Sequence, residues 1–195
     1  YLSGISLAIL SPTSRALLFN FLSTFRTRGG RVVFDNNYRP RLWQSREETQ
    51  QSYQQILTLT DIAFLTLDDE EALWGNRPLE EVIERTLTWG VDEIVIKRGS
   101  LPCVIVSKSG IREEVPAQKI AAQDVVDTTA AGDSFSAGYL ATRLAGQSVI
   151  DSARYAHRLA STVIQHRGAI IPLTAMPDPI TPDHPYNEAS HVSIA

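Results

Sequence analysis

The segment RVVFDNNYRPRLWQSREETQQSYQQILTLTDIAFL, residues 31–65, decides the fold class of this chain. It opens with a compact apolar run at 31–35 and closes with a second one at 61–65, and both are typical of buried strands. Between them, Ser45 begins a helical pattern whose first turn carries acidic residues. The order of strand, helix and strand predicts a βαβ unit, in which a right-handed crossover joins two parallel strands.

The same alternation of short apolar runs and helical patterns continues on both sides of this unit. Residues 1–9 and 92–97 read as further strands, and 103–107 with 112–115 as a hairpin. The other helical patterns lie between Ser11 and Gly30 and at 70–74, 79–89, 131–144 and 149–166. Strands that are separated by helices predict a mainly parallel sheet, and the late hairpin predicts an antiparallel addition at one edge.

Composition and charge exclude several classes of protein. The chain has 195 residues, and 18 basic against 22 acidic side chains give a formal net charge of -4. A general nucleic-acid binder would show a basic excess, so we expect no nucleic-acid partner. No apolar run reaches the roughly 18 residues of a membrane span, so we expect no membrane partner either. The single cysteine, Cys103, excludes an internal disulfide framework and fits a reducing cytoplasm.

Both ends of the chain are unusual. The only methionine is Met176, and Tyr1 leads directly into an apolar run. We therefore expect that the chain begins inside a folded protein, with processing at its start as the alternative. The last residues are rich in proline and poor in apolar side chains, so we expect 177–195 to be a disordered tail outside the core.

The string DTTAAGDSFSAGYL, residues 127–140, is the most informative for chemistry. Ala130, Ala131 and Gly132 precede Asp133 at the start of a helical pattern. Small residues let the backbone approach a ligand, and the N–H groups of a first helical turn form an anion site. An anion site beside a carboxylate that can accept a proton is what phosphoryl transfer requires. From spacing alone, an ordinary capped helix with small packing residues is an equal alternative.

Four strings in order resemble the PfkB/ribokinase family of carbohydrate kinases. DTTAAGD resembles the family signature D-T-x-G-A-G-D, and DNNYRPRLW at 35–43 resembles its D-x-N-x-R stretch. LDDEEALWG at 67–75 stands where the family has N-x-x-E, and RGA at 167–169 resembles its late glycine turn. Within the family, the strings resemble 2-keto-3-deoxygluconate kinases more than ribokinases or fructokinases.

The resemblance implies a fold and a reaction. The fold would be a ribokinase-like three-layer αβα domain, of which residues 1–176 would be the C-terminal portion, without the N-terminal strands and the lid. The reaction would be ATP- and Mg²⁺-dependent phosphorylation of the 6-hydroxyl of a sugar acid, 2-keto-3-deoxygluconate. The alternatives are a non-catalytic nucleotide-binding fragment and a kinase for a neutral sugar or a nucleoside. The full-length protein could form a homo-oligomer.

The resemblance also implies roles for single residues. Asp133 would contact the substrate hydroxyl as the catalytic base, and the backbone of Ala130, Ala131 and Gly132 would form the anion hole. Asn37 and Arg39 would face the sugar and phosphate cleft, and Glu71 and Asp68 would hold magnesium through water. The residues at the nucleotide would be Lys97, Gly99, Ser100, Asp127, Thr128 and Gly132.

Some residues depart from the family pattern or have a simpler interpretation. Ala130 replaces the usual first glycine, so we expect that this position does not need a positive φ. Asp68 replaces the asparagine of N-x-x-E, and without the resemblance the acids at 68–71 read as the charge pattern of a helix N-terminus. Pro102 stands where a second glycine is common. His157 reads as part of a solvated helix face.

Overall fold

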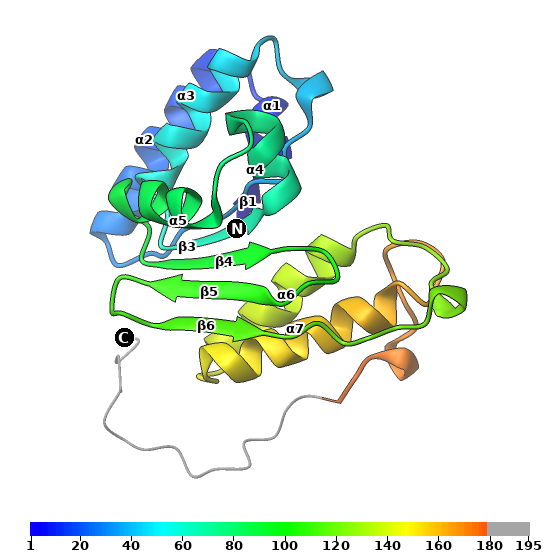
Figure 1. Cartoon of the computed structure of the whole chain (residues 1–195). Coiled ribbons are helices and arrows are strands. Elements are labelled where there is room, and N and C mark those ends of the chain that lie inside the picture. Colours follow the sequence, from blue (N-terminus) through cyan, green and yellow to red (C-terminus); the bar gives the residue numbers. More distant parts are fainter. Residues whose placement is uncertain (179–195) are drawn as a thin grey trace. The chain divides into compact units, whose positions relative to one another are not determined.

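The computed structural model describes residues 1–178 and divides the chain into two compact units, Tyr1–Lys119 and Ile120–Ala195 (Figure 1). The boundary between the two units falls inside residues 1–176, which the sequence analysis expects to form one portion of a kinase domain. The predicted tail, 177–195, lies outside the described residues from residue 179 onward. Each unit is described by itself.

The first unit contains a six-stranded sheet whose strands follow one another in chain order. The strands are β1 (Leu2–Ser3), β2 (Val33–Asp35), β3 (Ile62–Thr66), β4 (Glu93–Lys97), β5 (Cys103–Ser107) and β6 (Arg112–Val115). The strands β1 to β4 pair in parallel, and β5 pairs antiparallel with both β4 and β6. The predicted mainly parallel sheet with a late hairpin is therefore confirmed.

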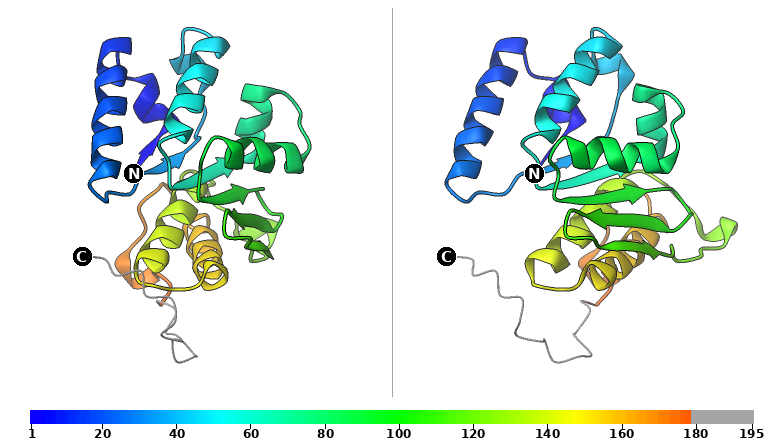
Figure 2. Two further views of the ribbon diagram at one scale, coloured as in Figure 1. Left: turned by 90° about the vertical axis from the view of Figure 1, so that its left-hand side faces the viewer. Right: turned by 60° about the vertical axis from the view of Figure 1, so that its left-hand side comes forward.

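Five helices connect the parallel strands on one side of this sheet. They are α1 (Gly4–Ala8), α2 (Pro12–Thr27), α3 (Arg46–Leu57), α4 (Leu67–Trp74) and α5 (Leu79–Thr88), with a 3-10 turn at Pro40–Leu42. Right-handed crossovers between strands in sequential order place their helices on the same face, as Figures 1 and 2 show. Serine caps begin two of them, because Ser11 accepts from the Ser14 N–H at 3.2 Å and Ser45 from the Glu48 N–H at 3.1 Å.

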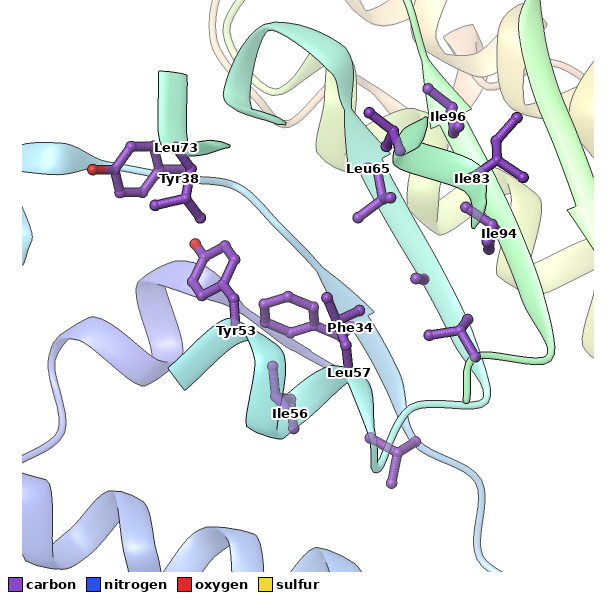
Figure 3. Packing of buried hydrophobic residues seen from close by; sticks show 14 of the residues in the cluster. Phe34, Tyr38, Tyr53, Ile56, Leu57, Leu65, Leu73, Ile83, Ile94 and Ile96 are labelled. Atoms are coloured by element: carbon purple, nitrogen blue, oxygen red, sulfur yellow. The ribbon is translucent and has the colours of Figure 1, made fainter. Parts of the chain in front are cut away.

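The core of the first unit lies between the sheet and these helices (Figure 3). Phe34 of β2 meets the ring of Tyr53 from α3 edge to face, with the ring centroids 5.2 Å apart. Other fully buried members come from neighbouring elements: Ile56, Leu57, Leu65, Leu73, Ile94 and Ile96. This packing fixes the ends of β2, β3 and β4 relative to α3 and α4.

The prediction of a strand over 1–9 is wrong after Ser3, where the chain turns into α1. Gly4 lies against the Tyr53 hydroxyl and the Asn36 carbonyl, so closely that a Cβ atom there would overlap both. The Ser6 hydroxyl accepts from the Ser3 N–H at 3.2 Å, which stabilises the helical turn. A short apolar run suits a buried strand and a buried helix equally, so periodicity could not separate the two.

The second unit pairs the helices α6 (Ala131–Leu144) and α7 (Val149–Val163), with 3-10 turns at Ala122–Asp124 and Leu173–Ala175. Gly138 lets them approach, since a Cβ there would lie 3.1 Å from the Ala156 Cα. The solvated position predicted for His157 is wrong: its ring is buried edge-on against Phe135, with the centroids 4.9 Å apart. Within residues 1–178, no helix combines the length and the apolar character needed to cross a membrane.

Candidate active site

The site residues of the first unit lie where three adjacent parallel strands end. β2 ends at Asp35, β3 at Thr66 and β4 at Lys97, and all three strands are paired side by side. Ligands of open α/β sheets bind beyond such carboxyl ends. Every residue of this unit that the sequence assigned to sugar, metal or nucleotide lies at or just after one of these strand ends: in the loop after β2, in α4 after β3, or at Lys97 and in the loop after β4.

The side chain of Asn36 joins the ends of β2 and β3. Its Oδ1 accepts from the Asn37 N–H at 2.8 Å and from the Thr66 N–H at 3.0 Å. Its Nδ2 donates to the Thr66 carbonyl and to Glu70 Oε1, both at 3.1 Å. Asn36 is only 1% exposed, so each of these bonds satisfies a group that water cannot reach. The amide thereby fixes the backbone that leads into Asn37 and Arg39.

The four acids that begin α4 divide into two inward and two outward side chains. Asp68 and Glu71 are exposed, whereas Asp69 is half-buried and Glu70 is buried. Asp69 Oδ2 accepts from the Tyr38 N–H at 3.1 Å, and Glu70 contacts Asn36 as described. The inward pair therefore supports the loop after β2, while the outward pair faces solvent.

A buried ion pair anchors α4 to α5. Glu70 binds the guanidinium of Arg85, which also lies 4.7 Å from the ring centroid of Trp74 and 5.0 Å from that of Trp89. Burial raises the pKa of Glu70, and the charge of Arg85 and the hydrogen bond from Asn36 oppose that rise. Removing Arg85 would leave the buried carboxylate of Glu70 without its countercharge.

Arg39 extends from the loop after β2 into partly exposed space. Its side chain is 52% exposed, and its NH1 donates to the carbonyl of Tyr38 at 2.8 Å. The same nitrogen lies 3.8 Å from Asp69 Oδ1. Asn37 has a φ of 29°, so the chain turns sharply just before Arg39. Burial raises the pKa of Asp69, against the Tyr38 N–H and the charge of Arg39.

The end of β4 brings Lys97 to the same group of strand ends. Lys97 Nζ donates to Asp35 Oδ2 at 2.8 Å, across the intervening strand β3, and both side chains are almost completely buried. Gly99 follows with a φ of 61°, and Gly99 and Ser100 are exposed. The structure therefore links Lys97 to β2 through Asp35, and leaves Gly99 and Ser100 at the surface beyond β4.

In the second unit, the N-terminus of α6 begins at a strained residue. Ala130 has φ 61° and ψ 15°, the left-handed conformation, and its side chain provides no capping oxygen. The expectation that Ala130 needs no positive φ is therefore wrong: the turn requires this conformation, and alanine adopts it at a steric cost. Asp133 lies in the first turn of α6 and is exposed. The helix therefore begins with small residues, Ala131 and Gly132, directly before Asp133.

Asp127 ties the loop before α6 to the turn after α7. Its carboxylate accepts from the Thr129 N–H at 2.8 Å and from the Gly168 N–H at 2.9 Å. Hydrogen bonds from Thr129 and then from Gly168 lower the pKa of Asp127 to about 2. Two of the strings that carried the resemblance, DTTAAGD and RGA, are thus in direct contact.

Sequence reasoning missed the residues that support the candidate site. Asn36, Asp69, Glu70 and Arg85 form the network behind Asn37 and Arg39, yet none was assigned a role. The Asp-Asn pair at the end of a buried strand was an available signal for Asn36. No signal in the sequence distinguishes Asp69 and Glu70 from their exposed neighbours, because that difference depends on how α4 is rotated against β2.

The exposed acids of α4 fit a magnesium ion that is held mainly through water. Mg²⁺ prefers oxygen ligands and usually keeps several waters, with one or two carboxylates and substrate phosphates completing its shell. Asp68 and Glu71 are three residues apart and therefore share one side of the helix. Residues 1–178 contain no cluster of three or more metal-ligating side chains. The assignment of Asp68 and Glu71 to magnesium stays a prediction.

Solved structures define the class of this fold. Aminoimidazole riboside kinase from Salmonella enterica superposes with a TM-score of 0.74 at 24% identity, over 91% of this chain and 58% of that chain. An Escherichia coli protein of the ribokinase II type, solved with ATP and Mg²⁺, gives a TM-score of 0.71 at 25% identity, over 86% of this chain and 52% of that one. The predicted ribokinase-like α/β class is confirmed.

The pfkB family carbohydrate kinase profile matches residues 1–176, and the chain belongs to this family. It is 63% identical to 2-dehydro-3-deoxygluconokinase from Escherichia coli K12, over 91% of this chain and 57% of that relative. It is 41% identical to the enzyme of the same name from Haemophilus influenzae, over 90% of this chain and 56% of that relative. The chain thus spans little more than half the length of these relatives.

The strain at Ala130 predicts opposite responses at two adjacent alanines. Ala130→Gly should leave the free energy of unfolding unchanged or raise it by about 1 kcal/mol, because glycine adopts the left-handed conformation without steric cost. Ala131→Gly, at the first helical position, should lower it by about 0.5–1 kcal/mol. Urea denaturation of the two variants and the wild type measures both effects. Equal losses of unfolding free energy in the two variants would contradict the left-handed conformation of Ala130.

The low pKa of Asp127 predicts a pH-dependent contribution to stability. Its folded-state pKa of about 2 lies below the unfolded value of about 3.9, so the contribution is complete above that value and is lost as the pH falls towards 2. Asp127→Asn should therefore lower the melting temperature at pH 7, by an amount that shrinks below about pH 4. Thermal melts from pH 7 to pH 3 measure this difference.

The exposed Asp124 provides the control for that series. Asp124→Asn should melt like the wild type, because a surface substitution away from such contacts usually has little effect. A difference in melting temperature between Asp127→Asn and the wild type that stays constant down to pH 3 would show that the charge of Asp127 does not hold the loop.

Proposed function

We propose that this chain carries the base and the phosphate-binding backbone of an ATP-dependent kinase for 2-keto-3-deoxygluconate, also called 2-dehydro-3-deoxygluconate. The observation that carries the proposal is the N-terminus of α6, where Ala130 opens the helix in a left-handed turn and Asp133 follows in the first turn. The 63% identity to a 2-dehydro-3-deoxygluconokinase supports this choice of substrate.

In the proposed reaction, phosphoryl transfer needs one proton acceptor and one site for negative charge. The oxygen of the substrate 6-hydroxyl attacks the γ-phosphorus of ATP and gives its proton to the Asp133 carboxylate. The bond from the γ-phosphorus to the bridging oxygen breaks, and ADP leaves. Backbone N–H groups of Ala130, Ala131 and Gly132 would stabilise the charge on the transferring phosphoryl group. The Ala131 N–H, which donates to the Thr128 carbonyl at 3.2 Å, would turn to the phosphoryl oxygen instead. The side chains of Ala130, Ala131 and Gly132 are no larger than a methyl group.

The proposed sugar side lies beyond β2. The guanidinium of Arg39 is half-exposed and can form two parallel hydrogen bonds to a carboxylate, the group that distinguishes a sugar acid from a neutral sugar. Asn37, at the sharp turn before it, offers an amide to the sugar hydroxyls. Arg39 is therefore the residue of this unit best suited to select an acid substrate.

The proposed nucleotide contacts are named for each unit by itself. In the first unit they are Lys97, the last residue of β4, and then Gly99 and Ser100; in the second unit, Thr128 lies in the loop before α6. Asp127 contributes through its bonds to Thr129 and Gly168, which hold that loop. When magnesium is bound, Asp68 and Glu71 would hold it through water, and the ion would neutralise charge on the phosphates. A cytoplasmic location, predicted from Cys103, belongs to the same proposal.

Replacing the proposed base separates catalysis from binding. Asp133→Asn keeps the size of the side chain but removes its capacity to take a proton. It should lower kcat by about 10²–10⁴-fold while the Kd for ATP changes little. Isothermal titration with ATP and a coupled assay for ADP in the presence of 2-keto-3-deoxygluconate measure the two quantities. Asp124→Asn, exposed in the same unit, is the matched control.

Other outcomes of that experiment favour the alternatives. ATP binding by the wild-type chain without transfer to any sugar would indicate a nucleotide-binding unit that does not catalyse the reaction alone. Transfer to fructose or a nucleoside in preference to the sugar acid would indicate a neutral substrate. Wild-type kcat in Asp133→Asn would contradict the assignment of the base.

A further inference from the structure

One carboxylate contacts two consecutive residues of the loop that carries Arg39. Asp69 Oδ2 accepts from the backbone N–H of Tyr38 at 3.1 Å. Asp69 Oδ1 lies 3.8 Å from the Arg39 guanidinium. The two oxygens of Asp69 therefore reach both the backbone before Arg39 and the end of its side chain.

Asp69 is itself held on a rigid element. It lies in the first turn of α4, and the next residue, Glu70, is bonded to Asn36 and Arg85. The other end of α4 is bonded to α3, because Gln50 Nε2 donates to the Leu73 carbonyl at 2.9 Å. A carboxylate on such a support occupies a defined position, as a residue that orients another must.

Arg39 has few other contacts that fix its position. Its side chain is half-exposed, and within residues 1–178 its one hydrogen bond is to the carbonyl of the preceding residue. A long side chain of this kind has many rotamers, and holding it in one costs conformational entropy. The charge of Asp69 favours those rotamers that keep the guanidinium near α4. Tyr38 cannot shift to compensate, because its ring is buried 6.3 Å from that of Tyr53.

We propose that Asp69 is a positioning residue that holds the Arg39 guanidinium ready for the carboxylate of a sugar acid, and so favours acid over neutral sugars. This inference rests on the proposed function, in which Arg39 binds that carboxylate. Asp69 does not contact the substrate. Its effect passes through Arg39, so it must disappear when Arg39 is absent.

A double-mutant cycle on the 195-residue chain tests this dependence. The Kd for 2-keto-3-deoxygluconate is measured by isothermal titration for the wild type, Asp69→Asn, Arg39→Ala and the double variant. The buffer contains no nucleotide and no magnesium, so that an effect through Asp68 or Glu71 on a metal cannot contribute. Fructose serves as the neutral probe, and Glu81→Gln, an exposed acid on α5, is the control.

The expected result is specific to acid sugars and to an intact Arg39. Asp69→Asn should raise the Kd for the sugar acid by roughly 3- to 30-fold and leave the Kd for fructose unchanged. In the Arg39→Ala background, Asp69→Asn should have no further effect. If Asp69→Asn does not fold in a thermal melt, Asp69→Glu keeps the charge but displaces it, and should show the same selectivity at smaller amplitude.

Five results would overturn the inference. An unchanged Kd for the sugar acid in Asp69→Asn would show that Asp69 does not orient Arg39 for binding. A lower Kd would show that Asp69 competes with the sugar acid for the guanidinium. Equal effects of Asp69→Asn with and without Arg39 would show a general structural role. These three results leave the proposed function intact if Arg39→Ala weakens binding. No effect of Arg39→Ala, or no binding by the wild type, removes the proposed role of Arg39 and the inference together.

Discussion

The first unit depends on one buried side chain, the amide of Asn36. Its bonds to Asn37, Thr66 and Glu70 connect the ends of two parallel strands to the first turn of α4. Loss of the amide would remove one hydrogen-bond partner from the Asn37 N–H, from both backbone groups of Thr66 and from Glu70 Oε1, at a cost of about 1–3 kcal/mol for each group that stays unsatisfied. The loop with Arg39 is therefore placed by the same contacts that stabilise the fold.

The features that sequence predicts well are those set by local pattern. The strand at Val33–Asp35, the helix capped by Ser45 and the strand at Ile62–Thr66 all follow from periodicity and capping, as does the late hairpin. The family resemblance located the same strand ends and the N-terminus of α6. These predictions succeed because each element is determined mainly by residues close together in the chain.

The features that sequence did not predict depend on contacts between distant residues. Residues after Ser3 form a helix because Gly4 fits against Tyr53 and Asn36, which lie more than thirty positions away. His157 is buried because Phe135 of the preceding helix covers it. The left-handed Ala130 shows that a loop can impose a conformation that the residue disfavours. Residue type alone carries none of this information.

The most direct test of the account is the identity of the phosphorylated product. The wild-type chain is incubated with ATP, Mg²⁺ and 2-keto-3-deoxygluconate, and the reaction is followed by ³¹P nuclear magnetic resonance. The account predicts one new phosphomonoester on the 6-hydroxyl for each ADP formed, and no product from fructose under the same conditions. A folded chain that binds ATP and yields no sugar phosphate, or one that phosphorylates fructose instead, would contradict it.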